Sequence, residues 1–235
     1  MKNKQVETIF HQARNHDGCF QALSLIQIFF GLFPDHTKLR VRHAPVDKEP
    51  GVSYITTTSR RLILEMVFQN PKLTTAIIAF PKGKVRASGH TQEMNHAVIG
   101  FSPLDSETIT TFFDLSSMQF GDLGRGLGPK GKELFALDTP DEFTLRCDKL
   151  ATGADPNKNR TSLAISGTSD DDWLTEVAQR VKTRWDKRGE EKWCGHCGAH
   201  AAKLRCSGTC NEAFYCSKEH ERLAWSFHKG YCSAA

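Results

Sequence analysis

The feature that most constrains this chain is a run of cysteines and histidines at its C-terminal end. Six of the eight cysteines lie between residues 194 and 232, with histidines among them. The candidate ligands are Cys194, Cys197, Cys206, Cys210, Cys216, His220, His228 and Cys232. Eight ligands are the number that two tetrahedral zinc ions require, and ligands three or four residues apart can reach one ion. Such a short segment cannot bury enough apolar surface to fold alone, so we expect two Zn²⁺ ions to supply the missing stability.

The alternative for clustered cysteines is a disulfide framework, and the cellular compartment decides between the two. The first residues contain no apolar stretch of signal-peptide length, and the most apolar run, residues 23–33, is too short to span a membrane. We therefore expect an intracellular protein, cytoplasmic or nuclear, without a membrane partner. Reducing conditions there favour metal binding over disulfides.

The same segment resembles a known family, the MYND-type zinc finger. The resemblance covers residues 194–232 and includes two cysteine pairs, the Tyr-Cys-Ser of 215–217, Trp225 shortly before His228-Lys229, and the closing Cys232. It implies a cross-braced module with interleaved ligands. One ion would be held by Cys194, Cys197, Cys216 and His220, and the other by Cys206, Cys210, His228 and Cys232.

Two positions depart from the pattern of that family. His220 stands where a cysteine is usual, and histidine is a competent zinc ligand through a ring nitrogen. Three residues separate Cys206 from Cys210 where two are usual, and Gly208 would absorb the extra residue. His196 and His200 are rival ligands for the first ion, and we expect both to be surface side chains instead.

If all eight ligands bind, neither ion keeps an open coordination position, so the sites are structural and the module does no chemistry. The resemblance implies that the finger binds other proteins, through a surface groove that recognises short proline-containing peptides. Trp225 and Phe227 could line such a groove or belong to the small core. Basic residues are in excess from residue 180 onwards and would offset the charge of the thiolates. Nucleic-acid binding is not expected, because no basic face with interleaved aromatics is visible.

Helix signals followed by strand signals predict an α+β domain over residues 1–150. We expect helices at 18–30 and 59–69, and strands at 75–80, 96–101, 109–115, 132–137 and 142–147. Residues 151–168 are rich in turn formers and predict a linker, residues 169–190 an amphipathic connecting helix, and residues 193–232 the finger. The glycine-rich stretch 121–132 predicts a surface loop, because no strand–turn–helix context supports a phosphate-binding site.

Three residues of the front domain raise the possibility of catalysis. Cys19 begins a buried helix, His96 opens an apolar strand, and Asp114 ends another. A helix N-terminus favours a thiolate, and a histidine held by a carboxylate can take the thiol proton. This order resembles papain-like and transglutaminase-like folds, in which Gln12 or Asn15 would supply an oxyanion donor. The competing interpretation is a packed core cysteine, a hydrogen-bonded histidine and a strand-end aspartate. Cys147 lacks a basic partner in register and is expected to be core.

Two functions therefore compete. The first is a zinc-binding interaction or adaptor protein that uses its C-terminal finger. The second is a papain-like cysteine hydrolase or transferase with the finger as its targeting module.

Overall fold

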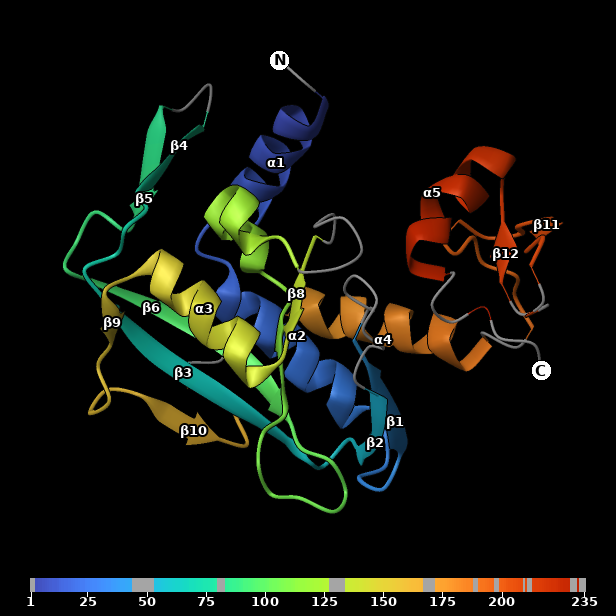
Figure 1. Ribbon diagram of the computed structural model, residues 1–235, viewed down its shortest axis with the longest axis horizontal. Helices are drawn as coiled ribbons and strands as arrows, with labels where there is room; N and C mark the ends of the chain where they lie inside the picture. Colours follow the sequence, from blue (N-terminus) through green and yellow to red (C-terminus); the bar gives the residue numbers. More distant parts are fainter. Residues whose placement is uncertain are drawn as a thin grey trace.

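The computed structural model describes residues 3–43, 53–79, 83–126, 134–166, 172–187, 190–196, 199–208, 210, 213–228 and 232. Its largest element is an antiparallel sheet with the strand order β10-β3-β6-β7-β8, and β9 also pairs with β3 (Figure 1). The strands are β3 (Arg61–Gln69), β6 (Glu93–Phe101), β7 (Thr111–Asp114), β8 (Ala136–Asp138), β9 (Gly153–Ala154) and β10 (Arg160–Ser162).

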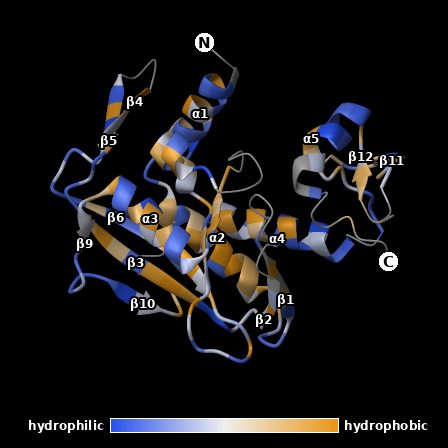
Figure 2. Cartoon of the chain, in the orientation of Figure 1, coloured by the Kyte–Doolittle hydropathy of each residue, from blue (hydrophilic) through white to orange (hydrophobic). Residues whose placement is uncertain are grey.

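The two central strands, β3 and β6, are covered on both faces, which explains why their sequences are nearly continuous apolar runs. On one face, Ile63, Ala97 and Ile99 pack with Leu23 and Ile26 of α2 (Cys19–Gly31). On the opposite face, the intervening residues belong to a second cluster with α3 (Pro140–Leu150); its strand residues are Met66, Phe68 and Val98. Figure 2 shows the resulting hydrophobic band along α2 and β3, with hydrophilic β10 at the sheet edge.

The helix α4 (Asp172–Asp186) packs against α2. Its buried residues are Leu174 and Ala178, whereas Trp173 and Trp185 are exposed. Arg184 near its end stacks over the ring of Trp193 at 4.8 Å from the ring centroid. One side of this amphipathic helix therefore completes the front domain, and its end is tied to the start of the finger.

The 3-10 helix η1 (Ser117–Gly124) follows β7 and is held from two directions. The helix α1 (Asn3–Arg14) packs against it, and Thr8 donates a 2.8 Å hydrogen bond to Asp122. From α3, buried Arg146 donates to both carboxylate oxygens of Asp138 at 2.8 Å and to the carbonyl oxygen of Leu123 at 2.7 Å. Arg146 therefore links η1, through the Leu123 carbonyl, to Asp138 on β8 of the sheet.

Two hairpins extend from this body: β1 (Lys38–Arg42) with β2 (Ser53–Thr57), and β4 (Thr75–Ala79) with β5 (Lys84–Ser88). The finger consists of β11 (Leu204–Arg205), β12 (Phe214–Tyr215) and α5 (Lys218–His228), around a core of its own that includes Ala202, Tyr215 and Ala224. Figure 1 shows it beyond the end of α4, away from the sheet. No helix among the described residues is long and apolar enough to cross a membrane.

The fold class is confirmed: a mixed helix and sheet region precedes the C-terminal finger. Three local predictions were wrong. Where a helix was predicted at 59–69, the structure has strand β3 (Arg61–Gln69); its apolar residues on both faces hide the strand period. Residues 142–147 belong to helix α3, which starts with a capping box between Thr139 and Glu142 and with Pro140 in its first turn. The predicted linker, residues 151–168, contributes β9 and β10 to the sheet and buries Ile165 in the core.

Two further expectations differ in extent. The strand predicted at 132–137 is the shorter β8, and the one at 109–115 is β7. The glycine-rich stretch 121–132 begins with the end of η1, and its residues 127–132 lie outside the described residues.

Candidate metal centre and candidate catalytic site

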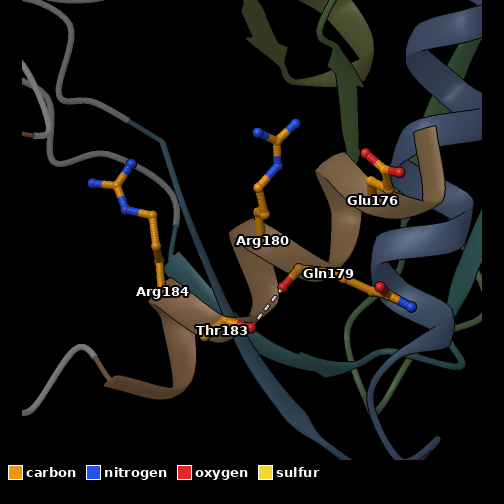
Figure 3. Close-up of a pocket in the computed structure, with 5 residues that line it drawn as sticks. All are labelled: Glu176, Gln179, Arg180, Thr183 and Arg184. Atoms are coloured by element: carbon orange, nitrogen blue, oxygen red, sulfur yellow. Dashed lines mark hydrogen bonds between the residues drawn. The ribbon is translucent and has the colours of Figure 1, made fainter. Parts of the chain in front are cut away.

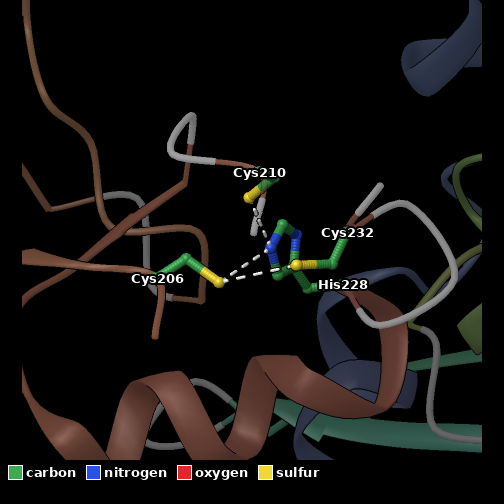
Figure 4. A group of neighbouring side chains, drawn as sticks. All are labelled: Cys206, Cys210, His228 and Cys232. Carbon is green, nitrogen blue, oxygen red and sulfur yellow. Dashed lines mark hydrogen bonds between the residues drawn. The ribbon is translucent and has the colours of Figure 1, made fainter. Parts of the chain in front are cut away.

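One group of four side chains in the finger has the donors of a complete zinc site: Cys206, Cys210, His228 and Cys232. Their ligand atoms all lie within 4.8 Å of one another and converge in Figure 4. The Sγ atoms of Cys206 and Cys232 are 3.8 Å apart, which is the separation of about 3.8 Å that two Zn–S bonds of ~2.3 Å give at the tetrahedral angle. Nε2 of His228 lies 3.1 Å from Cys210 Sγ and 3.2 Å from Cys206 Sγ. Thiolates and an imidazole are the donors that zinc prefers.

The backbone around Gly208 shapes this group. The amide of Gly208 donates to Cys206 Sγ at 3.3 Å. A Cβ at residue 208 would lie 2.5 Å from Cys232 Sγ, so only glycine fits there. Burial raises the pKa of the Cys206 thiol to about 11, although the Gly208 amide acts to lower it. A cation is therefore what would hold this sulfur as a thiolate.

A second group brings Cys194, Cys216 and His220 together. Nδ1 of His220 lies 2.8 Å from Cys216 Sγ and 3.6 Å from Cys194 Sγ. The expected fourth ligand, Cys197, lies outside the described residues. The rival His200 is exposed and contacts Glu191 at 2.9 Å, and the ring of exposed His196 lies 4.8 Å from that of His220 without joining the group.

A residue that the sequence interpretation missed holds the two halves of the finger together. Glu221 on α5 is 6% exposed. Its carboxylate accepts a 2.6 Å hydrogen bond from the amide of Ser207 and forms a 2.8 Å ion pair with Lys218. Lys218 and the Ser207 amide lower the pKa of its carboxyl to about 2. Because Ser207 follows Cys206, this contact ties the four-ligand group to α5. In the sequence Glu221 shows only as one of several charged residues on the helix.

The two groups alternate along the chain, so that each joins a residue upstream of β12 to one on or after α5. Such interleaving defines a cross-braced zinc-binding module. Comparison with known families agrees: residues 194–232 match the MYND finger family. The finger of this chain is therefore a zinc-binding MYND finger, a type of module that mediates protein–protein interactions.

Among curated proteins, the finger is similar to Egl nine homolog 1. The chain is 44% identical to the Mus musculus protein over 43 residues, 18% of this chain and 10% of the relative. It is 41% identical to the Homo sapiens protein over 46 residues, 20% of this chain and 11% of the relative. The chain thus spans about a tenth of the length of these relatives. No solved structure matches the chain.

In the front domain, the structure brings Cys19, His96 and Asp114 to one end of the sheet. Asp114 lies one step beyond the Ile99–Phe113 pair of β6 and β7, so it shares a sheet face with His96. Nε2 of His96 is 2.9 Å from Oδ2 of Asp114, and both side chains are almost fully buried. Cys19 is the first residue of α2, and its Sγ lies 4.0 Å from the carbonyl oxygen of Asn95, next to His96.

The ring of His96 is held tightly. Phe68 stacks on it at 5.5 Å between ring centroids, and Phe120 meets its edge at 5.1 Å. Burial acts to lower the pKa of His96, but the Asp114 carboxylate and the Cys19 thiol outweigh it and raise that pKa to about 10. A base so oriented next to a thiol is the arrangement that cysteine catalysis uses.

The other candidates of the front domain have other partners. Gln12 donates to Thr75 Oγ1 at 3.1 Å, and Asn15 donates to the carbonyl oxygen of His11 at 2.8 Å. Cys147 lies half-buried on α3, where burial raises its pKa to about 12.

A surface hollow on α4 lacks the features of a site. Its lining residues are Glu176, Gln179, Arg180, Thr183 and Arg184, and Figure 3 shows that all five project from this single helix. The hydrogen bond drawn there, from Thr183 Oγ1 to the carbonyl oxygen of Gln179, belongs to the helix itself.

Proposed function

We propose that the finger binds two zinc ions through the eight predicted ligands and docks this chain, inside the cell, onto proteins that present short proline-containing segments. The four-ligand group carries this proposal, because Cys206, Cys210, His228 and Cys232 fill a tetrahedral shell and leave no position for a substrate. A closed site of this kind stabilises a surface for binding.

The docking surface would be the outer side of α5. Trp225 stands there 42% exposed, and the tip of its indole approaches Gly208, next to the four-ligand group. Exposed aromatic rings beside a rigid scaffold bind proline rings at low entropic cost.

Metal analysis and peptide titration test this proposal. Purified protein should contain two zinc ions per chain, and a single ion would contradict the ligand assignment. Trp225→Ala should abolish binding of a proline-containing peptide library without changing the zinc content. The matched control is Trp173→Ala, which removes an exposed tryptophan from α4 and should leave binding intact. Equal losses in both variants would argue against α5 as the docking surface.

A second function is favoured by the cluster in the front domain: a papain-like cysteine hydrolase or transferase that the finger targets to its partners. His96 Nε2 is held by Asp114, which leaves Nδ1 to take the proton of the Cys19 thiol. The sulfur would then attack the carbonyl carbon of an amide or ester, and the free backbone N–H groups in the first turn of α2 would stabilise the oxyanion.

The rest of the cycle follows from the same residues. His96 returns its proton to the leaving amine or alcohol as the tetrahedral intermediate collapses to a thioester on Cys19. Water or an acceptor amine then attacks the thioester, with His96 as the base, and restores the free thiol. Asp114 stays ionised throughout and stabilises the imidazolium.

The test is selective alkylation of Cys19. Because its side chain is only 1% exposed, a small reagent such as iodoacetamide is required. Peptide mass spectrometry should show Cys19 modified well before Cys147, whose raised pKa keeps it protonated and makes it an internal control. His96→Ala should slow modification of Cys19 at neutral pH. Modification that is independent of His96 would support the packed-core interpretation instead.

A further inference from the structure

A closed circuit of hydrogen bonds surrounds the candidate base. Asp114 Oδ2 contacts His96 Nε2 at 2.9 Å, and Asp114 Oδ1 accepts from the hydroxyl and the backbone amide of Ser116, both at 3.0 Å. Gln119 Nε2 reaches Ser116 Oγ at 3.5 Å and His96 Nδ1 at 3.2 Å. In the first turn of η1, the backbone amide of Gln119 donates to the carbonyl oxygen of Ser116 at 2.9 Å. This turn places the side-chain amide of Gln119 at Nδ1 of the His96 ring.

The donor and acceptor roles in this circuit are mutually determined. Because the Ser116 hydroxyl donates to the Asp114 carboxylate, its oxygen can only accept from Gln119, which requires the NH₂ end of the amide there. The second N–H of Gln119 then points at His96 Nδ1, which must offer a lone pair. Asp114 and Cys19 act to raise the pKa of His96, but the geometry of the circuit fits the neutral imidazole, with its proton on Nε2 and donated to Asp114.

The same nitrogen is the one that Cys19 needs. With Nε2 occupied by Asp114, Nδ1 is the ring atom left to accept the thiol proton. Among the described contacts of the ring, Asp114 and Cys19 are the titratable groups, and both favour the protonated ring; Phe68 and Phe120 are apolar. Gln119 is the contact that favours the neutral form, because an N–H donor opposes a protonated Nδ1.

We propose that Gln119 is a positioning residue that restrains proton transfer from Cys19 to His96 by holding Nδ1 of the neutral ring. This inference rests on the proposed catalytic function. Proton transfer then waits until Gln119 moves off the ring, and an arriving acyl group that offers its own acceptor to the amide would cause that movement. Activation of the nucleophile is thereby linked to the presence of substrate.

Gln119→Met tests the inference, because methionine keeps the length of the side chain and removes the amide. The pH profile of Cys19 alkylation is compared in the full chain for the wild type, Gln119→Met, His96→Ala and the remote control Gln179→Ala. Loss of one hydrogen bond of ordinary strength should lower the midpoint in Gln119→Met by roughly half to one pH unit, and speed alkylation below the midpoint about threefold to tenfold. Gln179→Ala should leave the profile unchanged.

The outcomes separate the two proposals. If His96→Ala moves the profile but Gln119→Met leaves it in place or moves it upward, the role of Gln119 is refuted and catalysis stands. If His96→Ala has no effect, the catalytic proposal fails and this inference with it. A measurement on the unaltered chain guards against a variant that does not fold: nitrogen-15 NMR of histidine at neutral pH should show the proton of His96 on Nε2 and Nδ1 unprotonated. A proton on Nδ1 would overturn the inference.

Discussion

Replacing Gly208 with alanine should remove zinc from one of the two ligand groups. The added Cβ would lie 2.5 Å from Cys232 Sγ and 3.4 Å from Cys206 Sγ. Ordinary van der Waals contact between carbon and sulfur needs more than 1 Å of additional separation from Cys232. A zinc–sulfur bond tolerates only about 0.2 Å, so Cys232 cannot stay a ligand and also make room for the new methyl group.

The size of the effect follows from the ligand count. Structural zinc contributes ~10–16 kcal/mol in small finger peptides, so one of four ligands represents roughly 3–4 kcal/mol if they share equally. That is a loss of about two to three orders of magnitude in zinc affinity. Competition with a chromophoric chelator measures the affinity directly, and metal analysis after dialysis counts the ions that remain.

Gly31→Ala is the matched control for this experiment. A Cβ there meets nothing within 4 Å, and the residue ends α2 far from the ligands. It should keep both zinc ions and the wild-type affinity. If Gly208→Ala also keeps both ions at wild-type affinity, the close packing of residue 208 against Cys232 is refuted. The explanation that a glycine is needed to fit the extra residue between Cys206 and Cys210 would then fail as well.

Two other changes probe the two halves of the chain. Cys216→Ala should unfold the finger, seen as loss of zinc, while calorimetry finds the front-domain transition nearly unchanged; joint collapse would contradict independent folding. Phe143→Ala should cost about 3–5 kcal/mol in chemical denaturation, because this buried ring stacks on Phe112 at 4.2 Å, and it should leave the zinc content intact.

The errors of sequence interpretation in the front domain have two different physical causes. In α3 the apolar residues Phe143, Leu145 and Cys147 alternate as in a strand, yet the capping box at Thr139 and Glu142 starts a helix there. In β3 the apolar residues face both sides of the sheet, so neither the strand period nor the helix period is visible. A local signal that outweighs the alternation decides the first case, whereas tertiary packing, which the local pattern does not contain, decides the second.

The candidate sites were accessible from the sequence to different degrees. The ligands of the finger follow from spacing, because chelation requires neighbours along the chain. Cys19, His96 and Asp114 could be singled out because the sequence placed each near the end of a predicted element. Gln119 and Ser116 gave no signal in the sequence. Their roles arise only when the turn of η1 brings the side-chain amide of Gln119 to the His96 ring on β6. Glu221 is similar: its role depends on a loop, beside Cys206, that folds back onto α5.

The way in which the two halves join affects how both proposed functions would work together. Leu174 and Ala178 fix α4 on α2, the helix whose first residue is Cys19. At the other end of α4, Arg184 stacks on Trp193, immediately before the first zinc ligand, Cys194. A protein held by the finger would therefore be attached close to the helix that carries the candidate nucleophile, with little freedom to diffuse away. Such attachment raises the local concentration of a protein substrate around Cys19, so a weak docking contact would suffice for selection.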